Sequence, residues 1–412
     1  MNTSAFIARR IAFNRERSFS RFIIRLAIAA TVISVGAMIL TLAFTNGFQY
    51  AISQKVFNLW GHLRVQHYSA SRSSNSEEAP MSKNDTVLHV LKNDPDIRTI
   101  QAFATKFAVV RSSEGIDEVQ VKGVEKDYDF GNLQGFLRSG RWPRFPDSGY
   151  SNEIVLSQYT AGQLKLTVGD KLLIYFIQHG DSSPTVRIRP MIVSGLYKTG
   201  IEDYDKLLAI CDLRLIQRLN NWTPDKIGGY EVFTRDYQLA DRVSARIYDQ
   251  LPKDWGSRTT EEVYPNIFDW LNLQNITIII VLVIMIVVAT LNLVTCLIIL
   301  VLERTRMIGI LKAMGSPNMS IQRIFLYQGA LITLFGLVLG NVFGLLVCWL
   351  QDRYGFITLP EDAYFISKAV VKLEWWHVPL VNIGTFLICF LVLMIPTIVV
   401  RRMQPARAIQ FR

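Results

Sequence analysis

Four long stretches of the chain contain no Asp, Glu, Lys or Arg, and they are spaced unevenly along it. They are Leu26–Thr45, Leu273–Leu302, Ile324–Leu350 and Pro379–Val400. A helix of about 20 residues crosses the roughly 30 Å of hydrocarbon in a bilayer, and each stretch reaches that length. The pattern therefore predicts four transmembrane helices in a 1+3 layout, at residues 26–45, 273–302, 324–350 and 379–400.

The insert at residues 46–272 has the mixed polarity of a water-exposed domain. Alternating apolar and polar positions predict strands, most clearly at Leu63–Tyr68, Ala102–Arg111, Glu118–Val124, Lys171–Ile177 and Thr185–Tyr197. Helical spacing predicts short helices such as Thr86–Lys92 and Leu239–Leu251, and it extends the first span outward to about residue 58. We expect a large α+β extracytoplasmic domain, which could divide into two subdomains, on an α-helical membrane domain.

The formal net charge of +10 is concentrated at the ends of the predicted spans. Residues 1–25 carry six arginines against one glutamate, residues 303–323 carry four cations against Glu303, and residues 401–412 carry four arginines. If all four stretches span, these basic segments lie on one side, and the positive-inside rule makes that side the cytoplasm. The basicity is then a topology signal and not a nucleic-acid footprint. We expect both termini in the cytoplasm, with residues 46–272 and 351–378 outside it.

The N-terminal residues 2–25 intersperse aromatic and aliphatic side chains among the arginines. One interpretation is an amphipathic helix on the inner membrane surface, with its arginines toward anionic headgroups. The other is a basic stub that only fixes the orientation of the chain.

The segment between the second and third predicted spans is too regular and too apolar for a plain connector. Met307, Ile310, Leu311 and Met314 lie on one helical face, and Gly315-Ser316-Pro317 is expected to end the helix sharply. A short amphipathic helix of this kind either docks in a groove of a cytoplasmic partner or packs on the membrane surface. Composition does not decide between the two.

Glycines recur every four residues in the third predicted span, at Gly336, Gly340 and Gly344. In lipid, such a stripe lets another helix approach closely. We expect these positions to pack against another helix, and a sliding gate surface is the alternative.

The sequence carries no signature of catalysis. It has no G-x-x-x-x-G-K-[ST] motif, so the chain does not hydrolyse ATP through a P-loop. Its five histidines are scattered without metal-ligand spacing, and no nucleophile–base arrangement can be picked out. We therefore expect no catalytic, cofactor or metal site in this chain, and no enzymatic activity.

Three groups of motifs resemble a known family. The segment Glu303–Pro317, the following Ile321–Gly329 and the C-terminal Pro405–Ile409 resemble the FtsX-like permease subunits of ABC transporters. In the insert, Leu137–Pro143, Glu153–Ser157 and Val168-Gly169-Asp170 are similar to the MacB-type periplasmic domain of that family. The stretch Tyr197–Asp205 is similar to the lipoprotein-releasing LolC/LolE branch.

The resemblance implies a multi-pass permease of the bacterial inner membrane, with its large domain in the periplasm. It would pair with itself or with a similar second chain, above a dimer of separate LolD-like ATPase subunits that bind the ATP and magnesium. Residues 303–323 would form the coupling helix. Its contacts with the ATPase would come from Arg306, Met307, Ile310, Leu311, Lys312, Met314, Gly315 and Ser316.

The same resemblance implies a route for cargo. Acyl chains of a lipoprotein would enter a cavity from the outer leaflet, and ATP-driven closure would pass the lipoprotein to a LolA-like periplasmic carrier. The cavity would be lined by Phe44, Phe48, Ile52, Ile276 and Ile280. A hairpin loop at Gln178–Pro190 would dock the carrier through His179, Asp181, Pro184 and Arg187.

Other functions remain open on the sequence. One is an FtsX-type mechanotransmission permease that regulates cell-wall hydrolases, although its outer domain would be expected to be smaller. Another is a MacB-like efflux permease. A membrane-anchored receptor would leave the apolar helix at Met307–Met314 without a role.

Overall fold

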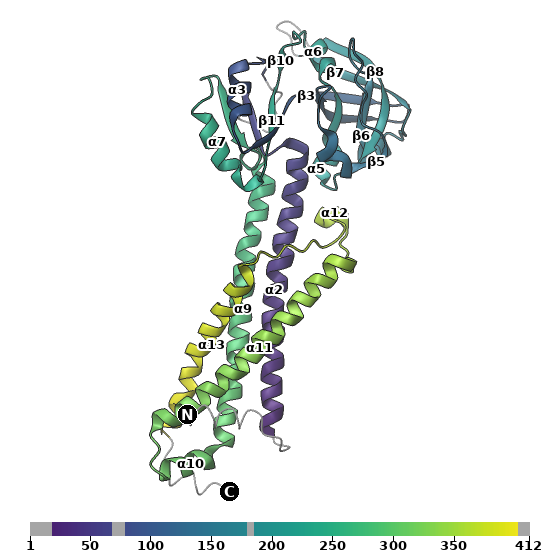
Figure 1. Ribbon diagram of the computed structural model, residues 1–412. Helices are drawn as coiled ribbons and strands as arrows, with labels where there is room; N and C mark the ends of the chain where they lie inside the picture. The colour runs from purple at the N-terminus through teal and green to yellow at the C-terminus, as the bar shows by residue number, and fades with distance from the viewer. Residues whose placement is uncertain (1–18, 68–78, 179–184, 403–412) are drawn as a thin grey trace. The chain divides into compact units, whose positions relative to one another are not determined.

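The computed structural model describes residues 19–67, 79–178 and 185–402 (Figure 1). The described residues form two compact units. The membrane unit comprises those of Met1–Tyr50, Leu271–Thr358 and Lys368–Arg412. The head comprises those of Ala51–Trp270 together with Leu359–Ser367. Most of the predicted N-terminal segment and of the C-terminal tail lies outside the described residues.

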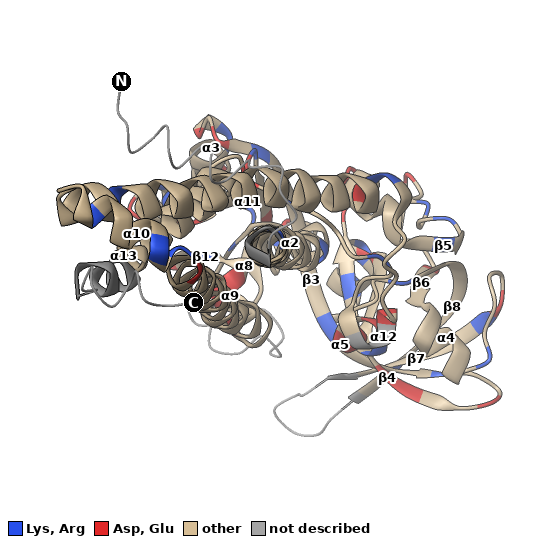
Figure 2. Cartoon of the chain, turned by 90° about the horizontal axis from the view of Figure 1, so that it is seen from below, with Lys and Arg blue, Asp and Glu red and all other residues tan. Residues whose placement is uncertain are grey.

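The membrane unit is built from long apolar helices. Four helices in the described part of the chain are long and apolar enough to cross a membrane, as the charge-free stretches predict. They are α2 (Phe19–Trp60), α9 (Pro265–Glu303), α11 (Asn318–Tyr354) and α13 (His377–Arg402), and α10 (Thr305–Ala313) lies between α9 and α11. Helices α9 and α11 contain no Asp, Glu, Lys or Arg over most of their length, and Figure 2 shows α11 largely in tan. Each helix extends beyond its predicted span because charged residues are tolerated outside the hydrocarbon.

Polar side chains join two of these helices. Asn341 on α11 donates from Nδ2 to Asn382 Oδ1 on α13 at 2.7 Å, and Asn382 donates back to Asn341 Oδ1 at 3.0 Å. Each amide also donates to a carbonyl of its own helix, that of Leu337 or Val378. The reciprocal pair satisfies donors and acceptors that water cannot reach in the bilayer, so it fixes α11 against α13.

The head contains one large mixed sheet. Its strands are β1 (Leu63–His67), β3 (Ile97–Arg111), β4 (Ile116–Val124), β5 (Leu137–Gly140), β6 (Glu153–Ser157), β7 (Lys171–Gln178), β8 (Thr185–Tyr197), β9 (Leu208–Asp212), β11 (Gly229–Thr234) and β12 (Trp255–Thr259). The strand order is β12-β1-β11-β3-β4-β9-β6-β8-β5. Because β7 pairs with both β3 and β8, the strands β3-β4-β9-β6-β8-β7 close into a ring. A two-stranded sheet of β2 (Met81–Ser82) and β10 (Lys226–Ile227) adds to the head.

Strand β3 belongs to two parts of the sheet, within a head that forms one compact unit. Its first half pairs with β11 and its second half with β4, so it belongs to both the open sheet and the ring. Helices α3 (Asp85–Asn93) and α7 (Ala240–Tyr248) flank the open part, and the strands β5 to β8 lie on the other side (Figure 1). The shorter helices are α4 (Gln158–Gln163), α5 (Glu202–Leu207), α6 (Leu213–Leu219), α8 (Thr260–Val263) and α12 (Glu361–Tyr364), with 3-10 turns η2 (Phe130–Phe136) and η3 (Tyr237–Leu239).

A buried ion pair lies at the end of α2. The Lys122 ammonium on β4 is 2.7 Å from each oxygen of the Glu231 carboxylate on β11, and both side chains are 0% exposed. The same ammonium donates to the carbonyl of Leu59 at 2.6 Å and lies 4.8 Å from the centre of the Trp60 ring. Burial, and then the Glu231 carboxylate, raise the pKa of the neighbouring Tyr128 well above its usual value. A lysine at the last turn of a helix also satisfies a carbonyl that has no partner within the helix. The ion pair therefore anchors the end of α2 in the head.

A buried histidine gives the head a predictable dependence on pH. His62 Nδ1 accepts a hydrogen bond from the Thr234 backbone N–H at 3.0 Å, and burial, with Arg98 nearby, lowers its pKa to about 4. An unfolded chain takes up this proton near pH 6.5, before the folded chain does. We therefore expect the contribution of His62 to the free energy of unfolding to be fully present above about pH 6.5. It should fall by about 3 kcal/mol as the pH drops toward 4. Thermal unfolding of the chain in detergent between pH 4 and 7 measures it. His62→Gln should flatten this part of the profile, and an unchanged slope would assign it to other groups.

Candidate functional site

Helix α10 ends in the tight turn that the Gly315-Ser316-Pro317 sequence predicts. Gly315 has φ +84°, a conformation that glycine adopts without strain. Its N–H donates to the Lys312 carbonyl at 3.0 Å, and the Ser316 N–H donates to the Leu311 carbonyl at 3.0 Å. These bonds satisfy carbonyls at the end of the helix, and Pro317 is the N-cap residue that precedes α11. This turn fixes the direction in which the chain leaves α10 and enters α11.

The apolar face predicted for α10 is divided in two. Met307 and Leu311 are partly buried and pack against a core that includes Ile308, which is fully buried. Ile310 and Met314 are instead exposed, by 48% and 78%. Ile308 was missed because it lies beside the predicted face, at one residue from Met307. The helix is therefore anchored on one side and presents an apolar surface on the other.

The polar members of the predicted coupling set are distributed around this surface. Arg306 and Gly315 are exposed, whereas Lys312 and Ser316 are half-buried. With Ile310 and Met314 between them, they form a patch that mixes apolar and cationic groups. Such a patch suits a groove lined by apolar and acidic side chains.

The residues predicted to line a lipid cavity fall in different places. Phe44 and Phe48 are half-buried on α2, and Ile276 and Ile280 are exposed on α9. The Gln49 side chain of α2 donates to the Leu271 carbonyl at 2.9 Å and to Asn275 at 3.0 Å, so these parts of α2 and α9 are adjacent.

Ile52 departs from that prediction. It belongs to the head and is only 1% exposed, so its side chain is not available to a ligand in this structure. Its helical spacing from Phe48 is correct, but α2 enters the head beyond Tyr50, and burial there changes what the position can contact.

The predicted carrier-docking hairpin is only partly described. His179, Asp181 and Pro184 lie outside the described residues. Arg187 on β8 donates to the carbonyls of Arg218 and Leu219, at 3.2 and 2.9 Å, and to the Asn221 side chain at 3.1 Å. The guanidinium therefore ties the base of the hairpin to the end of α6.

The outward face of the same hairpin carries apolar residues that the sequence reasoning did not select. Leu173 on β7 and Val186, Ile188 and Ile192 on β8 are exposed. Their alternation with Arg187 and Arg189 was a usable signal. Because the opposite face of the strands is also apolar toward the core, the pattern did not show which face was outside.

The three glycines of α11 face α2. A Cβ added at Gly336 would lie 2.6 Å from Thr31 Cβ, one at Gly340 2.8 Å from Val35 Cβ, and one at Gly344 3.1 Å from Ile39 Cβ. At Gly336 and Gly340 a Cβ would force the two helices apart, and at Gly344 Ile39 would have to shift by a few tenths of an ångström, so the glycines permit the observed approach of α11 and α2.

Two family models match the chain. The model described as MacB-like periplasmic core domain matches residues 26–249, more than half of the chain, and the model described as FtsX-like permease C-terminal matches residues 279–405. Both matches agree with the motifs noted in the sequence. Together they cover most of the head and of the membrane helices.

Curated relatives match over nearly the full length. The lipoprotein-releasing system transmembrane protein LolE of Haemophilus influenzae is 24% identical over 99% of both chains. The LolC proteins of Xylella fastidiosa and Neisseria meningitidis are 23% and 24% identical over 96% of each chain. Among solved structures, the extracellular domain of the transporter YknZ from Gram-positive bacteria is 13% identical with a TM-score of 0.32, covering 48% of this chain and 98% of that one. The periplasmic region of MacB from Actinobacillus actinomycetemcomitans is 12% identical with a TM-score of 0.33, covering 50% and 91%.

The four apolar helices, the α+β head and the two family matches lead to one assignment. They describe a membrane permease. The chain belongs to the FtsX/MacB-like family of ABC transporter permeases.

Proposed function

We propose that this permease extracts lipoproteins from the outer leaflet of the bacterial inner membrane and passes them to a periplasmic carrier. The observation that carries the proposal is the similarity to lipoprotein-releasing LolC and LolE proteins over 96–99% of the chain. Similarity in one domain alone would support only the assignment as a permease. Similarity through both the head and the membrane helices supports lipoprotein release as the function.

The energy for this task would come from a partner. Each buried methylene of an acyl chain contributes about 0.8 kcal/mol to membrane affinity, so extraction of a multiply acylated protein does not proceed unaided. The chain has no P-loop, and ATP and magnesium would bind in a separate ATPase subunit. Both termini and α10 would then face the cytoplasm, in keeping with their basic residues, and the head would face the periplasm.

Helix α10 is the surface on which we place the ATPase. Its exposed Ile310 and Met314 are held by the anchored Met307, Ile308 and Leu311. A packed helix with an apolar outer surface can transmit displacement in both directions, because it is not free to rotate on its own bundle. Simple packing of α10 on the membrane would need no such anchored arrangement.

The cargo and carrier surfaces follow from the same proposal. Phe44 and Phe48 on α2 and Ile276 and Ile280 on α9 offer apolar surface to acyl chains. A second permease, either a copy of this chain or a similar one, would close the cavity. The hairpin of β7 and β8 would receive the carrier.

Release in a reconstituted system tests the proposal. The chain is purified with the ATPase that co-isolates, placed in liposomes, and supplied with a triacylated lipoprotein and a carrier. We expect ATP to move the lipoprotein into the soluble fraction. ATP hydrolysis without release would favour the division-type or efflux function, and the absence of any co-isolating ATPase would overturn the transporter assignment.

Negative charge on the exposed surface of α10 should weaken binding of the ATPase. We expect Ile310→Glu with Met314→Glu to weaken its binding at least about tenfold, because two apolar contacts are lost and two carboxylates replace them. Both residues are exposed, so folding should be unaffected. Co-purification and quantitative binding measure the effect. Ile116→Glu, the same change at an exposed residue of β4, is the control. Unaltered binding would mean that α10 does not contact the ATPase.

A further inference from the structure

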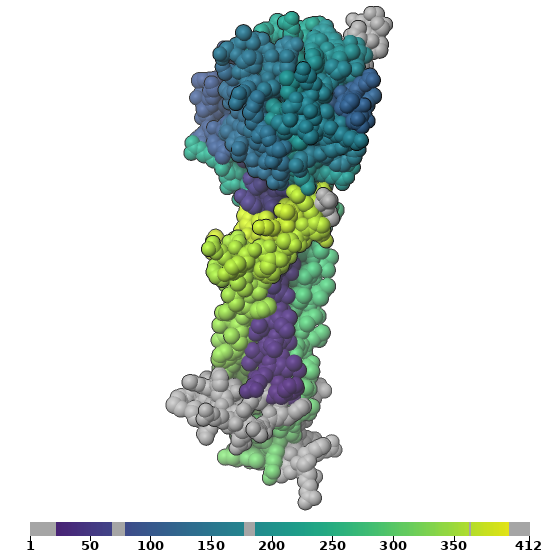
Figure 3. Space-filling model, turned by 90° about the vertical axis from the view of Figure 1, so that its right-hand side faces the viewer, coloured from purple at the N-terminus to yellow at the C-terminus, as the bar shows by residue number. Residues whose placement is uncertain are grey.

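The connection between α11 and α13 contains a segment that belongs to the head. Residues 359–367, called the loop segment below, include α12 and the buried Ile366. The Leu359 N–H donates to the Ser367 carbonyl at 3.1 Å, which closes the loop segment on itself. Figure 3 shows this face of the molecule, with the loop segment in yellow-green beside the purple atoms of α2.

Two lysines hold the loop segment through Glu361. The Glu361 carboxylate lies 3.1 Å from Lys198 Nζ, at the end of β8, and 3.9 Å from Lys55 Nζ on α2. Lys55 also donates to the carbonyls of Thr199 and Phe365, at 2.5 and 2.6 Å. The three side chains are largely shielded from solvent, so these ion pairs are stronger than exposed ones. A single ammonium thus joins α2, the turn after β8 and the loop segment.

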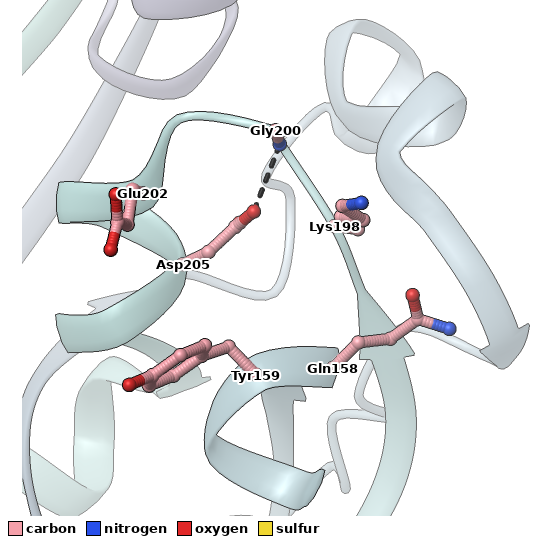
Figure 4. A pocket seen from close by; sticks show the side chains of 6 residues that line it. All are labelled: Gln158, Tyr159, Lys198, Gly200, Glu202 and Asp205. Atoms are coloured by element: carbon pink, nitrogen blue, oxygen red, sulfur yellow. Dashed lines mark hydrogen bonds between the residues drawn. The ribbon is translucent and has the colours of Figure 1, made fainter. Parts of the chain in front are cut away.

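The turn after β8 is shaped to receive the glutamate. Asp205 accepts hydrogen bonds from the Thr199 and Gly200 backbone N–H groups, at 2.8 and 2.9 Å, and the second of these is drawn in Figure 4. Gly200 has φ +79°, and a Cβ there would lie 2.7 Å from Glu361 Oε1 and 2.9 Å from Lys55 Nζ. The positive φ favours glycine at position 200, and a Cβ there would displace the Glu361 carboxylate and the Lys55 ammonium from their present positions. Lys198, Gly200 and Asp205 of the stretch Tyr197–Asp205 therefore all lie at this contact.

The shallow pocket beside this turn does not need a ligand to explain its charges. It has a volume of about 420 Å³ and is lined by Gln158, Tyr159, Lys198, Gly200, Glu202 and Asp205 (Figure 4). Lys198 pairs with Glu361, Glu202 pairs with Lys206, and Asp205 holds the turn. Its charges serve contacts within the head.

The start of α9 completes the contact. The rings of Trp270 and Phe365 meet edge to face, with centroids 5.9 Å apart. The loop segment is therefore held to the first helix, to the beginning of the second long helix and to the turn after β8, all within the head.

Two chain connections, called legs below, join the loop segment to the membrane helices: residues 355–358 after α11 and residues 368–376 before α13. They are paired with each other. The Ala369 N–H donates to the Ile357 carbonyl at 3.1 Å, and Thr358 and Lys368 form an antiparallel bridge. Gln351, buried at the end of α11, donates to the carbonyls of Ile357 and Ala369, at 3.2 and 2.9 Å, and accepts from the Ile357 N–H at 2.9 Å. Because one side chain of α11 holds both legs, they follow the end of that helix.

We propose that the loop segment is a strut that carries displacement of α11 and α13 to the head, and that Glu361 is the positioning residue that fixes it there. The inference rests on the proposed function, because the displacement arises in the ATP-driven cycle. Without the Glu361 contacts, the membrane helices would still move, but the turn after β8 would no longer follow them.

Charge exchange tests the strut in the reconstituted complex. Glu361→Lys places a third cation beside Lys55 and Lys198, and Lys198→Glu in the same chain restores one ion pair. The control exchanges the adjacent exposed pair on α5, Glu202→Lys with Lys206→Glu, which leaves the loop segment untouched. Glu361→Gln removes the charge without repulsion and serves if the lysine variant does not fold.

We expect Glu361→Lys and Glu361→Gln to keep ATP hydrolysis within about twofold while lipoprotein release per ATP falls about fivefold or more, the usual range of a coupling between sites. The double exchange should recover most of the release, and the control should match the wild type. Two results would overturn the proposal of a strut. One is wild-type lipoprotein release by both Glu361 variants. The other is a double exchange that binds the ATPase normally but recovers no lipoprotein release.

A second measurement separates the strut from the proposed cargo. Hydrogen exchange of residues 198–205 is compared between the ATP-bound and nucleotide-free complexes, without lipoprotein. We expect a nucleotide-dependent difference in the wild type that is lost in Glu361→Gln. If the difference is present and depends on Glu361 but no lipoprotein is released, the cargo assignment fails and the strut stands. If the difference persists in Glu361→Gln, the strut fails.

Discussion

Lys122→Met is expected to lower the free energy of unfolding of the head by about 3–5 kcal/mol, the usual effect of leaving a buried charge without its partner. Lys122 and Glu231 are both fully buried, and the ammonium lies 2.7 Å from the carboxylate. Methionine has a similar volume, so the change removes charge more than packing. The carbonyl of Leu59 would lose its donor as well, which should loosen the end of α2. Chemical unfolding of the full chain in detergent, followed by tryptophan fluorescence, measures the loss.

The double variant Lys122→Met with Glu231→Leu is the matched control. Removing both charges removes the desolvation cost of each, so most of the stability should return. If the double variant is as unstable as the sum of the two single ones, the cost comes from packing and not from the unpaired carboxylate.

Gly340→Leu should produce the second large effect, a separation of α11 from α2. The first side-chain atom would already lie 2.8 Å from Val35 Cβ and 3.1 Å from the Val32 carbonyl oxygen, and three further carbons have no space. Overpacking of this kind costs about 1–3 kcal/mol or more, because both backbones must move. We expect a clear fall in the yield of monodisperse protein, measured by fluorescence-detected size exclusion.

Gly384→Leu provides the comparison for this variant. Gly384 is a glycine of α13, and apart from its chain neighbours and the nearby backbone of its own helix no described atom lies within 4 Å of a Cβ added there. Its replacement should leave the yield unchanged. Equal losses at both positions would mean that helix propensity or lipid contact, and not the approach to α2, determines the result. Gly340→Ala that folds but releases no lipoprotein would instead favour the sliding-gate alternative.

The membrane helices were predictable because one physical requirement dominates them. A span must be long and free of charge, and a simple scan of the sequence detects both properties. Strands β7 and β8 were also found with nearly correct bounds, since a turn-rich segment separates two alternating runs. By contrast, β3 begins at Ile97, earlier than predicted, because its first residues pair with β11 far along the chain. Local alternation contains no information on such pairing.

The candidate sites show the same limit. The spacing of apolar residues predicts the amphipathic helix α10. Which of its residues are buried depends on the tertiary packing of Ile308 against other helices, which the spacing does not contain. Ile52 kept its helical register and still became buried, because the head surrounds that part of α2. Glu361 had no signal of its own, since its partners Lys55 and Lys198 are distant in sequence and the motif around Lys198 looked complete without it.

The ring formed by β3, β4, β9, β6, β8 and β7 limits how other proteins can recognise the head. Each strand of the ring pairs with a neighbour on both sides over at least part of its length, so the ring leaves only short strand edges open. Among the described strands of the main sheet, only the short β12 and β5 lie at its ends. Recognition by strand addition, in which a peptide extends a sheet, therefore has little backbone to use here. Proteins that bind the head would therefore recognise mainly its side chains. Their specificity would depend on surface residues that can be substituted one at a time without disrupting the fold.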